Sequence, residues 1–273
     1  MTGVPCLVSA VSGLGSLFIN NNLRSMFIRM LLYPIFKSAF NHKNQKIILQ
    51  NKNDLKVFTD WGVLNSLRVK LIKGSGVNLE NFDKYDEPVG IPIICFAARL
   101  IKEKGVNEFV AAAKILNERN IKAKYFLAGE IDKNNPSGLT EYDLNKIKED
   151  GYVEVLGYHK NIAELYSLSN IICLPSYREG LPKGLIEAAA ACRAVVTTDV
   201  PGCRDAIIPN ETGLLVPVKN SKKLADALQW LIENPKERFL MGKAGRKFAE
   251  KEFAIEKIVK THLNIYQELI ENK

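Results

Sequence analysis

The sequence contains little of what a metal centre or a disulfide framework requires. None of its five cysteines forms a Cys-x-x-Cys pair, and its three histidines lie far apart, at His42, His159 and His262. Zinc sites are built from closely spaced cysteine and histidine ligands, so we expect no metal site. Because the number of cysteines is odd and their neighbours are apolar, we expect free thiols in a reducing cytoplasm.

Three other features are missing, and each argues against a class of protein. No apolar stretch reaches the roughly 18 residues that a membrane-spanning helix needs, and no signal peptide is recognisable at the start of the sequence. No Gly-x-Gly-x-x-Gly follows a first strand, which argues against an NAD enzyme. No run of Lys and Arg is interleaved with aromatics, so we expect no nucleic-acid partner. The net charge of +8 favours phosphorylated small molecules or an anionic membrane surface as partners.

Apolar strands alternate with helices along most of the chain. This alternation predicts an α/β fold in which parallel strands are covered by helices on both faces. In such a sheet the ligand crevice lies at the carboxyl ends of the strands, so the residues after each strand are the candidates for a site. The predicted strands are 6–11, 46–50, 69–72, 91–98, 123–128, 153–156, 171–174, 195–198 and 213–216. The predicted helices are 23–40, 53–61, 106–119, 141–149, 162–168, 183–192, 221–233, 235–253 and 255–271, with a helical turn at 203–208.

Two cations follow the predicted strand 91–98. Arg99 comes directly after it and Lys104 follows five residues later. Arginine offers a planar fork and lysine a point charge, so the pair suits a diphosphate at the carboxyl end of the strand. A solvated basic turn before the next helix is the other interpretation of these residues.

Two carboxylates flank the start of the predicted helix 183–192. Glu179 lies in the loop before the helix, and Glu187 lies about one turn inside it. Pro182 stands where a helix start tolerates proline, and the amides and dipole of a helix start attract an anion. Carboxylates are poor phosphate ligands but good acceptors for sugar hydroxyls, so the combination points to a sugar nucleotide. Each residue also has an ordinary interpretation. Glu179 would then be a turn residue, and Glu187 a solvent-facing residue of the helix.

The order of these motifs resembles family 4 of the retaining glycosyltransferases, which have the GT-B fold. The resemblance covers about residues 70–271, and its signature is a pair of glutamates with seven residues between them, here Glu179 and Glu187. The motifs that carry it are Phe96-Ala97-Ala98-Arg99 with Lys104-Gly105, Ser176-Tyr177-Arg178-Glu179-Gly180-Leu181-Pro182, Thr197-Thr198-Asp199-Val200-Pro201-Gly202-Cys203 and Asn210-Glu211-Thr212-Gly213-Leu214-Leu215-Val216-Pro217.

The resemblance implies how the chain is divided. It places a complete C-terminal Rossmann-like domain, which binds the nucleotide sugar, at residues 75–254. A partial N-terminal Rossmann-like domain on the acceptor side occupies residues 1–74, and the last helix, 255–273, crosses back to it. The opening strands of the first domain are not recognisable in the sequence, so whether the chain is active alone is left open.

The same resemblance implies roles for the residues around the diphosphate. Arg99 and Lys104 would hold the donor diphosphate and stabilise the leaving group. Glu179 would bond hydroxyls of the donor sugar, with the amides of Gly180 and Leu181 nearby. Members of the family are generally metal-independent because cations neutralise the developing charge, and the sequence has no Asp-x-Asp motif. The nucleotide sugar is therefore expected as a substrate, without a metal or other cofactor.

The nucleoside end of the donor is assigned to two further residues by the resemblance. Glu187 would take the ribose hydroxyls. Tyr158, in the loop after the predicted strand 153–156, would border the base, although an ordinary loop aromatic is an equally good interpretation.

The acceptor side is represented by a glycine-containing turn and a basic helix. Ser12, Gly13 and Gly15 follow the first predicted strand in a turn similar to that of a subgroup acting on lipid-linked sugars for bacterial surface polysaccharides. The two glycines would allow a close backbone approach to a substrate, or they simply form a tight turn. The helix 23–40 is basic and amphipathic, so it would lie in a lipid interface or pack in the core of the first domain. Pro34 should kink or interrupt this helix.

The predicted function is transfer of a hexose or N-acetylhexosamine, with retention, from a nucleotide sugar to a lipid-linked acceptor. UDP is the expected nucleotide, and the expected location is the cytoplasm, at the inner face of the plasma membrane. Two alternatives stay open: a truncated, non-catalytic sugar-nucleotide-binding protein, and a GT-B epimerase that acts on the sugar nucleotide itself. A glycosidase is disfavoured because hydrolysis does not need Arg99 and Lys104.

Overall fold

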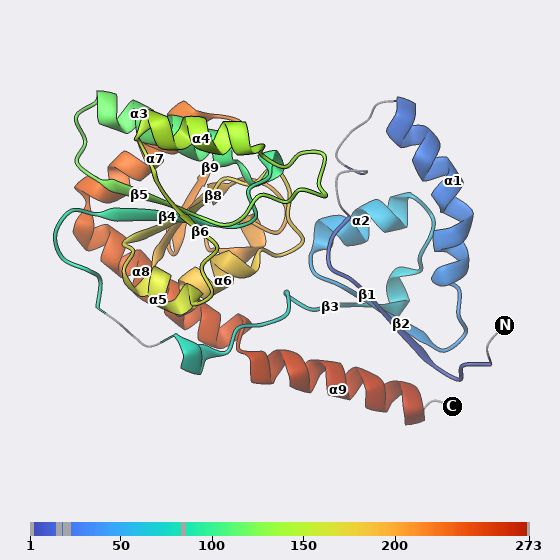
Figure 1. The fold of residues 1–273 in the computed structure, drawn as a ribbon. Helices are drawn as coiled ribbons and strands as arrows, with labels where there is room; N and C mark the ends of the chain where they lie inside the picture. The colour runs from blue at the N-terminus through green and yellow to red at the C-terminus, as the bar shows by residue number, and fades with distance from the viewer. Residues whose placement is uncertain (1–2, 15–17, 19–22, 83–85, 272–273) are drawn as a thin grey trace.

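The computed structural model describes residues 3–14, 18, 23–82 and 86–271. Within them, two parallel β-sheets lie side by side, and each has helices packed on it (Figure 1). The predicted α/β class with parallel strands is confirmed. The smaller sheet has the order β1-β2-β3 and consists of β1 (Leu7–Val11), β2 (Gln45–Leu49) and β3 (Val69–Leu71).

The larger sheet has the strand order β6-β5-β4-β7-β8-β9, and all neighbouring strands are parallel. The chain starts in the middle with β4, adds β5 and β6 on one side, and then adds β7, β8 and β9 on the other. This reversal makes a switch point between β4 and β7, where the loops after the two strands diverge and leave a crevice. The strands are β4 (Ile93–Ala97), β5 (Lys124–Ala128), β6 (Glu154–Gly157), β7 (Ile171–Leu174), β8 (Ala194–Thr198) and β9 (Gly213–Val216).

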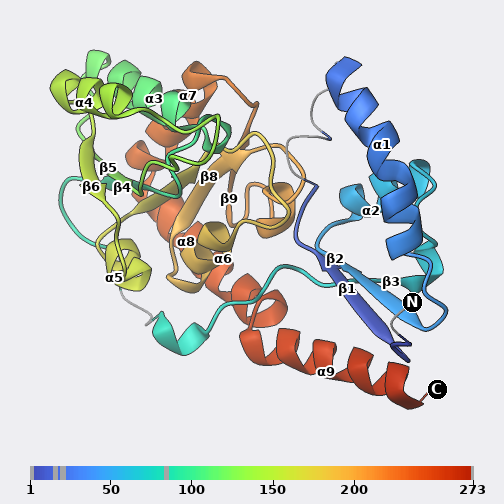
Figure 2. The same cartoon turned by 45° about the vertical axis from the view of Figure 1, so that its right-hand side comes forward.

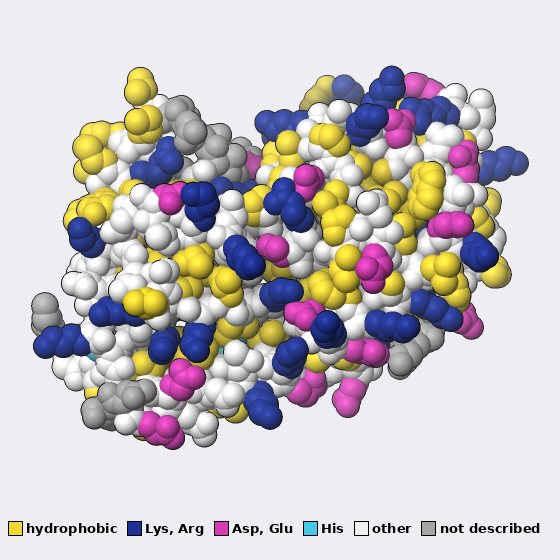
Figure 3. Space-filling model, turned by 180° about the vertical axis from the view of Figure 1, so that it is seen from behind, with side chains coloured by type: hydrophobic (Ala, Val, Ile, Leu, Met, Phe, Trp, Pro, Cys, Tyr) yellow, Lys and Arg dark blue, Asp and Glu magenta, His cyan; other side chains and the backbone are white. Residues whose placement is uncertain are grey.

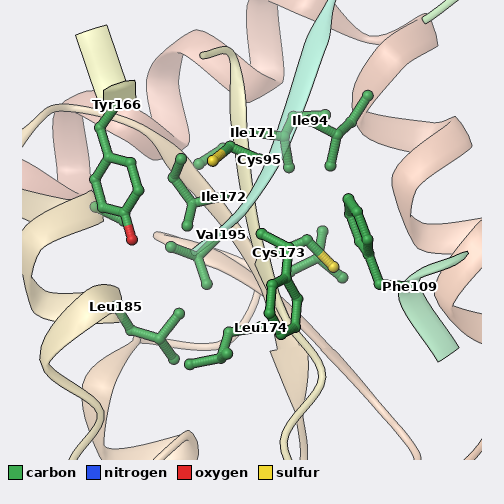
Figure 4. Close-up of a cluster of buried hydrophobic side chains, with 14 of the residues drawn as sticks. Ile94, Cys95, Phe109, Tyr166, Ile171, Ile172, Cys173, Leu174, Leu185 and Val195 are labelled. Atoms are coloured by element: carbon green, nitrogen blue, oxygen red, sulfur yellow. The ribbon is translucent and has the colours of Figure 1, made fainter. Parts of the chain in front are cut away.

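Helices cover both faces of the larger sheet (Figures 1 and 2). Strands between two helical layers have no solvent-facing side, and every residue of β7 and β8 is buried. In this core Phe109 lies on one side of the strands, and Tyr166 and Leu185 lie on the other (Figure 4). One face carries α3 (Val106–Glu118), α4 (Glu141–Asp150) and α7 (Ser221–Glu233); the other carries α5 (Ile162–Ser167), α6 (Lys183–Ala190) and α8 (Pro235–Glu252).

The smaller sheet is also packed on both faces, because successive side chains of a strand point in opposite directions. In β2, Ile47 and Leu49 pack with Phe58 of α2 (Lys52–Asp60), whereas Ile48 packs with α9 (Ile255–Glu271) on the other face. The long helix α1 (Leu23–Ala39) stacks on the outside of α2 through aromatic contacts such as Phe36 with Trp61, whose ring centroids are 5.4 Å apart.

The chain passes between the two sheets twice, and the two crossings are hydrogen-bonded to each other. Val77 N–H donates to the Phe253 carbonyl at 2.8 Å, and Ile255 N–H donates to the Val77 carbonyl at 3.1 Å. After the second crossing α9 runs beneath the smaller sheet (Figures 1 and 2). The division at residues 74 and 254 stays a prediction, and both crossings lie close to it.

Of the two effects expected of Pro34, a kink or an interruption, the interruption is wrong, because α1 continues through this residue. Proline removes one backbone donor and crowds the carbonyl four residues earlier, which belongs to Met30. Both residues lie on the exposed side of α1. The Met30 carbonyl can therefore be hydrated, and the proline ring has room.

Candidate active site

A cleft of about 660 Å³ lies at the switch point of the larger sheet and faces the smaller one. The larger unit contributes Arg99 after β4, and Glu179 and Gly180 after β7, to its wall. The smaller unit contributes Ser12 and Gly13, which follow β1. Residues predicted for the donor and the acceptor side therefore face one another across a single cleft. Gly15 lies outside the described residues.

A second pocket, of about 260 Å³, adjoins the first, and Arg99 lines both. Tyr158, Glu187 and the buried Tyr166 line this smaller pocket. Arg99 is mostly exposed, and its Nη1 lies 2.8 Å from Asp132 Oδ2. A surface ion pair of this kind is weak, so an incoming phosphate can compete for the guanidinium.

Lys104 and Glu179 form an ion pair inside the cleft. Lys104 Nζ lies 2.5 Å from Glu179 Oε1, both side chains are largely buried, and Ser176 Oγ donates to the same oxygen at 2.7 Å. Gly105, with φ of +78°, ends the turn that carries Lys104 and lies against the loop after β7. A β-carbon on Gly105 would lie only 2.2 Å from the Pro175 carbonyl oxygen, so no larger residue fits there.

Glu187 is an inward-facing residue of α6, so the interpretation as a solvent-facing helix residue is wrong for it. Its carboxylate lies 3.4 Å from Lys183 Nζ, one turn earlier on the same helix. Burial raises the pKa of the Glu187 carboxyl, and the nearby Lys183 partly offsets this rise. A carboxylate in such a setting gains strength as a hydrogen-bond acceptor because water competes poorly for it.

The loop that carries Glu179 is pressed between backbone segments on two sides. A β-carbon on Gly180 would lie 1.8 Å from the Ser12 carbonyl oxygen, and one on Gly202 would lie 2.5 Å from the Glu179 carbonyl oxygen. Gly13 packs directly on Gly180. Glycine at these positions thus allows protein backbones to approach each other. The side chain of Leu181 is buried beside Gly74, so it does not line the cleft.

Sequence reasoning missed several residues of this cleft. Arg24, from the first turn of α1, and Arg178, from the loop after β7, both line it. Glu103 also lines it and accepts a hydrogen bond from Ser137 Oγ at 2.5 Å. Arg178 pairs with Asp54 of the smaller unit at 3.1 Å, and this contact spans 124 positions of the chain. No local pattern signals a contact of that range.

The described residues contain no group of three or more His, Cys, Asp or Glu side chains placed to hold a metal ion. All five cysteines are free thiols. None of the helices described is long and apolar enough to cross a bilayer.

Fold and site together define a class of protein. A doubly wound sheet presents cations and largely buried carboxylates at its switch point, and a second parallel sheet closes the cleft. Such a site suits an enzyme whose substrate carries both phosphate and hydroxyl groups.

Residues 77–248, more than half of the chain, match the family described as glycosyl transferases group 1. The chain belongs to this family and is a glycosyltransferase. Among curated proteins it is 30% identical to the N,N'-diacetylbacillosaminyl-diphospho-undecaprenol alpha-1,3-N-acetylgalactosaminyltransferase of Campylobacter jejuni, with 98% of this chain and 72% of that enzyme covered. It is 28% identical to the capsular polysaccharide biosynthesis glycosyltransferase CapM of Staphylococcus aureus, with 59% of this chain and 42% of that protein covered.

Solved structures share the fold. Sucrose-phosphate synthase from Thermosynechococcus elongatus superposes with a TM-score of 0.82 at 24% identity, over 97% of this chain and 68% of that one. Anabaena HepE in complex with UDP and glucose superposes with a TM-score of 0.80 at 15% identity, over 96% of this chain and 71% of HepE. The predicted GT-B type of α/β fold is confirmed.

Proposed function

We propose that this protein transfers a hexose or N-acetylhexosamine, with retention, from a UDP-sugar to a lipid-linked acceptor in the synthesis of a bacterial surface polysaccharide or glycan. The observation that carries the proposal is the order of groups along the two adjoining pockets. Glu187 lies at one end, Arg99 lies between the pockets, and Lys104 and Glu179 lie at the other end. This order matches that of a nucleoside, a diphosphate and a sugar.

The smaller pocket suits the nucleoside. Glu187 would accept hydrogen bonds from the ribose hydroxyls, and the exposed ring of Tyr158 would border the base. Arg99 would hold the diphosphate, because its fork matches phosphate oxygens and it lies where the two pockets meet.

The larger pocket suits the sugar and the departing diphosphate. In the reaction the bond between the anomeric carbon and the diphosphate oxygen breaks, and the acceptor oxygen bonds to that carbon from the same face. The acceptor proton passes to the leaving diphosphate. Lys104 and Arg99 would stabilise the charge that develops on this diphosphate, which is the work a metal ion would otherwise do. Glu179 would accept hydrogen bonds from the sugar hydroxyls, with the backbone of Gly180 and Leu181 nearby.

Two relatives support the choice of substrates. The C. jejuni relative is named for transfer of N-acetylgalactosamine to a diphospho-undecaprenol-linked sugar. HepE has been crystallised with UDP and glucose. Applied to this chain as a proposal, these names make UDP the nucleotide and a lipid diphosphate the anchor of the acceptor.

The acceptor would enter from the smaller unit, past Ser12 and Gly13. Arg24 lines that side of the cleft, is exposed, and has no acidic partner among the described residues. Its guanidinium is therefore available to a phosphate of the acceptor. Because Arg24 lies in the first turn of α1, the acceptor's lipid would lie along the outer surface of this helix.

The apolar face of α1 consists of Leu23, Met26, Phe27, Met30, Leu31 and Ile35, each more than half exposed. Figure 3 shows hydrophobic side chains next to Lys and Arg side chains at the outer end of the smaller unit. The helix contains Arg24, Arg29 and Lys37 and no acidic residue. A basic helix with an exposed apolar face fits the interface of an anionic bilayer. We therefore propose a peripheral location on the inner face of the plasma membrane.

Replacement of Leu31 by serine is expected to weaken binding to vesicles of phosphatidylglycerol and phosphatidylethanolamine about fivefold to thirtyfold. Loss of a lipid-inserted leucine side chain costs about 1–2 kcal/mol. Co-sedimentation with the vesicles measures the effect. Leu240→Ser is the matched control, because Leu240 on α8 is 53% exposed and Leu31 is 55% exposed. Equal losses for both variants would contradict an interface on α1.

Glu187→Ala is expected to weaken UDP-hexose binding about 10- to 100-fold, since hydrogen bonds to a charged group contribute about 1.5–3 kcal/mol. The pKa of Glu187 lies above its usual value of 4.5. Affinity should therefore be full above that raised pKa and fall as the pH drops through it, because protonation removes the anionic acceptor. Isothermal titration calorimetry at a series of pH values around this pKa measures the affinity. The ligand is a UDP-hexose, because its diphosphate diester does not change its charge over this pH range. The affinity of Glu187→Gln should not depend on pH in this way. If this variant showed the same pH dependence as the parent chain, the assignment of Glu187 would be contradicted.

The function itself is tested with UDP-, GDP- and ADP-hexoses. A saturating donor should raise the melting temperature by several degrees, because it binds only the folded state. If none of the donors does so, the donor assignment fails. A protein that binds a donor but never turns it over with lipid diphosphate acceptors is a non-catalytic binder. Conversion of the UDP-sugar into a different UDP-sugar, without any acceptor, identifies an epimerase.

A further inference from the structure

A buried polar cluster joins the first turn of α2, in the smaller unit, to the loop that carries Glu179. Asp54 Oδ1 accepts a hydrogen bond from Arg178 Nη2 at 3.1 Å, and Asn51 Nδ2 donates to the Gly180 carbonyl at 2.9 Å. The residues on both sides of Glu179 are thus held by the smaller unit.

The smaller unit presents these two side chains in a fixed orientation. Asn51 caps α2, because its Oδ1 accepts the Asp54 N–H at 2.7 Å, and its Nδ2 donates to Asp54 Oδ2 at 3.0 Å. Each carboxylate oxygen of Asp54 therefore has one donor, Asn51 for Oδ2 and Arg178 for Oδ1. Asp54 is only 1% exposed, and a buried carboxylate persists when it is paired in this way.

Arg178 belongs to the larger unit, but the acidic partner that the structure gives it, Asp54, lies on α2 of the smaller unit. Its guanidinium lines the cleft and is largely buried against the smaller unit. Gly180 reaches Asn51 only because it lacks a β-carbon and can lie against the Ser12 carbonyl. The backbone around Glu179 is thus shaped by contacts that cross the cleft.

We infer that Asn51 and Asp54 are positioning residues: they hold Arg178 and Gly180, and through them they set the place of the Glu179 carboxylate opposite Lys104. This inference rests on the proposed function, in which Glu179 bonds the donor sugar. It adds that the sugar end of the donor site is completed by the acceptor-side unit. Among the residues that the structure describes, the nucleoside end around Glu187 is lined by the larger unit only.

The first test does not depend on activity. Hydrogen exchange of residues 176–181 is followed by mass spectrometry in the full chain without ligand. Asp54→Asn should accelerate exchange in this loop about tenfold or more, because it keeps the side-chain volume and removes the charge that orients Arg178. Asp60→Asn is the matched control, since Asp60 lies on the same helix in an exposed ion pair with Lys56. Unchanged exchange in Asp54→Asn would overturn the inference. If Asp54→Asn does not fold, Arg178→Gln removes the same ion pair by changing its less buried partner. Unchanged exchange of residues 176–181 in that variant would also overturn the inference.

The second test measures the catalytic consequence. Displacement of a positioned group costs on the order of 10- to 100-fold in rate. Asp54→Asn should lower kcat by this amount and change the KM for the UDP-hexose less than about threefold, because Arg99 and Glu187 are untouched. The double variant Asp54→Asn/Arg178→Gln should be no slower than the slower single variant, since both remove one contact. A kcat equal to the parent's, or multiplied losses in the double variant, would overturn the inference.

A purely structural role would lower the melting temperature and leave the kcat of the folded fraction unchanged. If the parent chain binds no donor, the proposed function fails, and the exchange experiment alone then decides whether these residues position the loop.

Discussion

Lys104→Ala is expected to lower kcat on the order of 100- to 1000-fold while it weakens donor affinity less than about tenfold. In the ground state Lys104 is already paired with Glu179, at 2.5 Å, so its charge adds little to binding of the intact donor. When the bond to the anomeric carbon breaks, negative charge grows on the departing diphosphate. A preorganised cation in a largely buried site stabilises this charge without reorganising, and loss of one such group typically costs this much in rate.

Steady-state kinetics and donor titration on the same preparation separate the two effects. Lys102→Ala is the control, because Lys102 belongs to the same short turn and is exposed outside the cleft. Lys104→Arg should recover part of the rate, since it keeps the charge and changes the geometry. A Lys104→Ala variant that loses affinity in full proportion to its rate would show that the lysine binds the ground state, and the proposed role would be wrong.

Gly180→Ala is expected to lower kcat/KM at least on the order of 100-fold and to reduce the melting temperature by several degrees. The added β-carbon would lie 1.8 Å from the Ser12 carbonyl oxygen and 2.7 Å from Gln50 Oε1. The first of these atoms belongs to the backbone, so a side-chain rotation cannot relieve the contact. The loop after β7 must therefore move away from the end of β1, and Glu179 moves with it. A shift of about 1 Å in a positioned group is enough for a loss of this size.

Activity with a UDP-hexose and a thermal melt measure both parts of this expectation. Gly245→Ala is the matched control, because Gly245 lies inside α8 and its added β-carbon would meet Ala189 Cα at an ordinary 3.5 Å. That variant should keep full activity and melt at the same or a higher temperature, since alanine favours a helix over glycine. Full activity in Gly180→Ala would contradict this prediction, because it would mean that the loop after β7 can move away from the end of β1 without disturbing Glu179.

Most of the secondary structure follows from the local pattern of the chain. The predicted strands 171–174 and 213–216 and the predicted helices 221–233 and 255–271 coincide with β7, β9, α7 and α9. Other elements differ by one or two residues at their ends. These predictions succeed because apolar periodicity reports burial directly, and a helix or strand must bury one face or both. Pro34 is the exception, because the cost of a proline depends on whether the carbonyl behind it can be hydrated.

The approximate location of the site could also be predicted. Arg99 and Glu179 each follow a strand, and parallel strands bring their carboxyl ends to one edge of the sheet. The structure places these residues, together with Lys104, around one cleft, with Glu187 in the adjoining pocket. Their roles in binding and catalysis stay predictions that the variants above would test.

The sequence by itself determined the order of strands and helices, the charged and carboxylate residues at the strand ends, and the family to which the chain belongs. These properties depend on neighbours within a few turns of the chain. Only the tertiary structure decided that Lys104 pairs with Glu179, that Gly180 lies against Ser12, and that Asn51 and Asp54 form hydrogen bonds with Gly180 and Arg178. Lys104 and Glu179 lie 75 positions apart within the larger unit. The other contacts join residues more than a hundred positions apart across the two packed units, where the close approach of the backbones sets them, so no local pattern records any of these contacts.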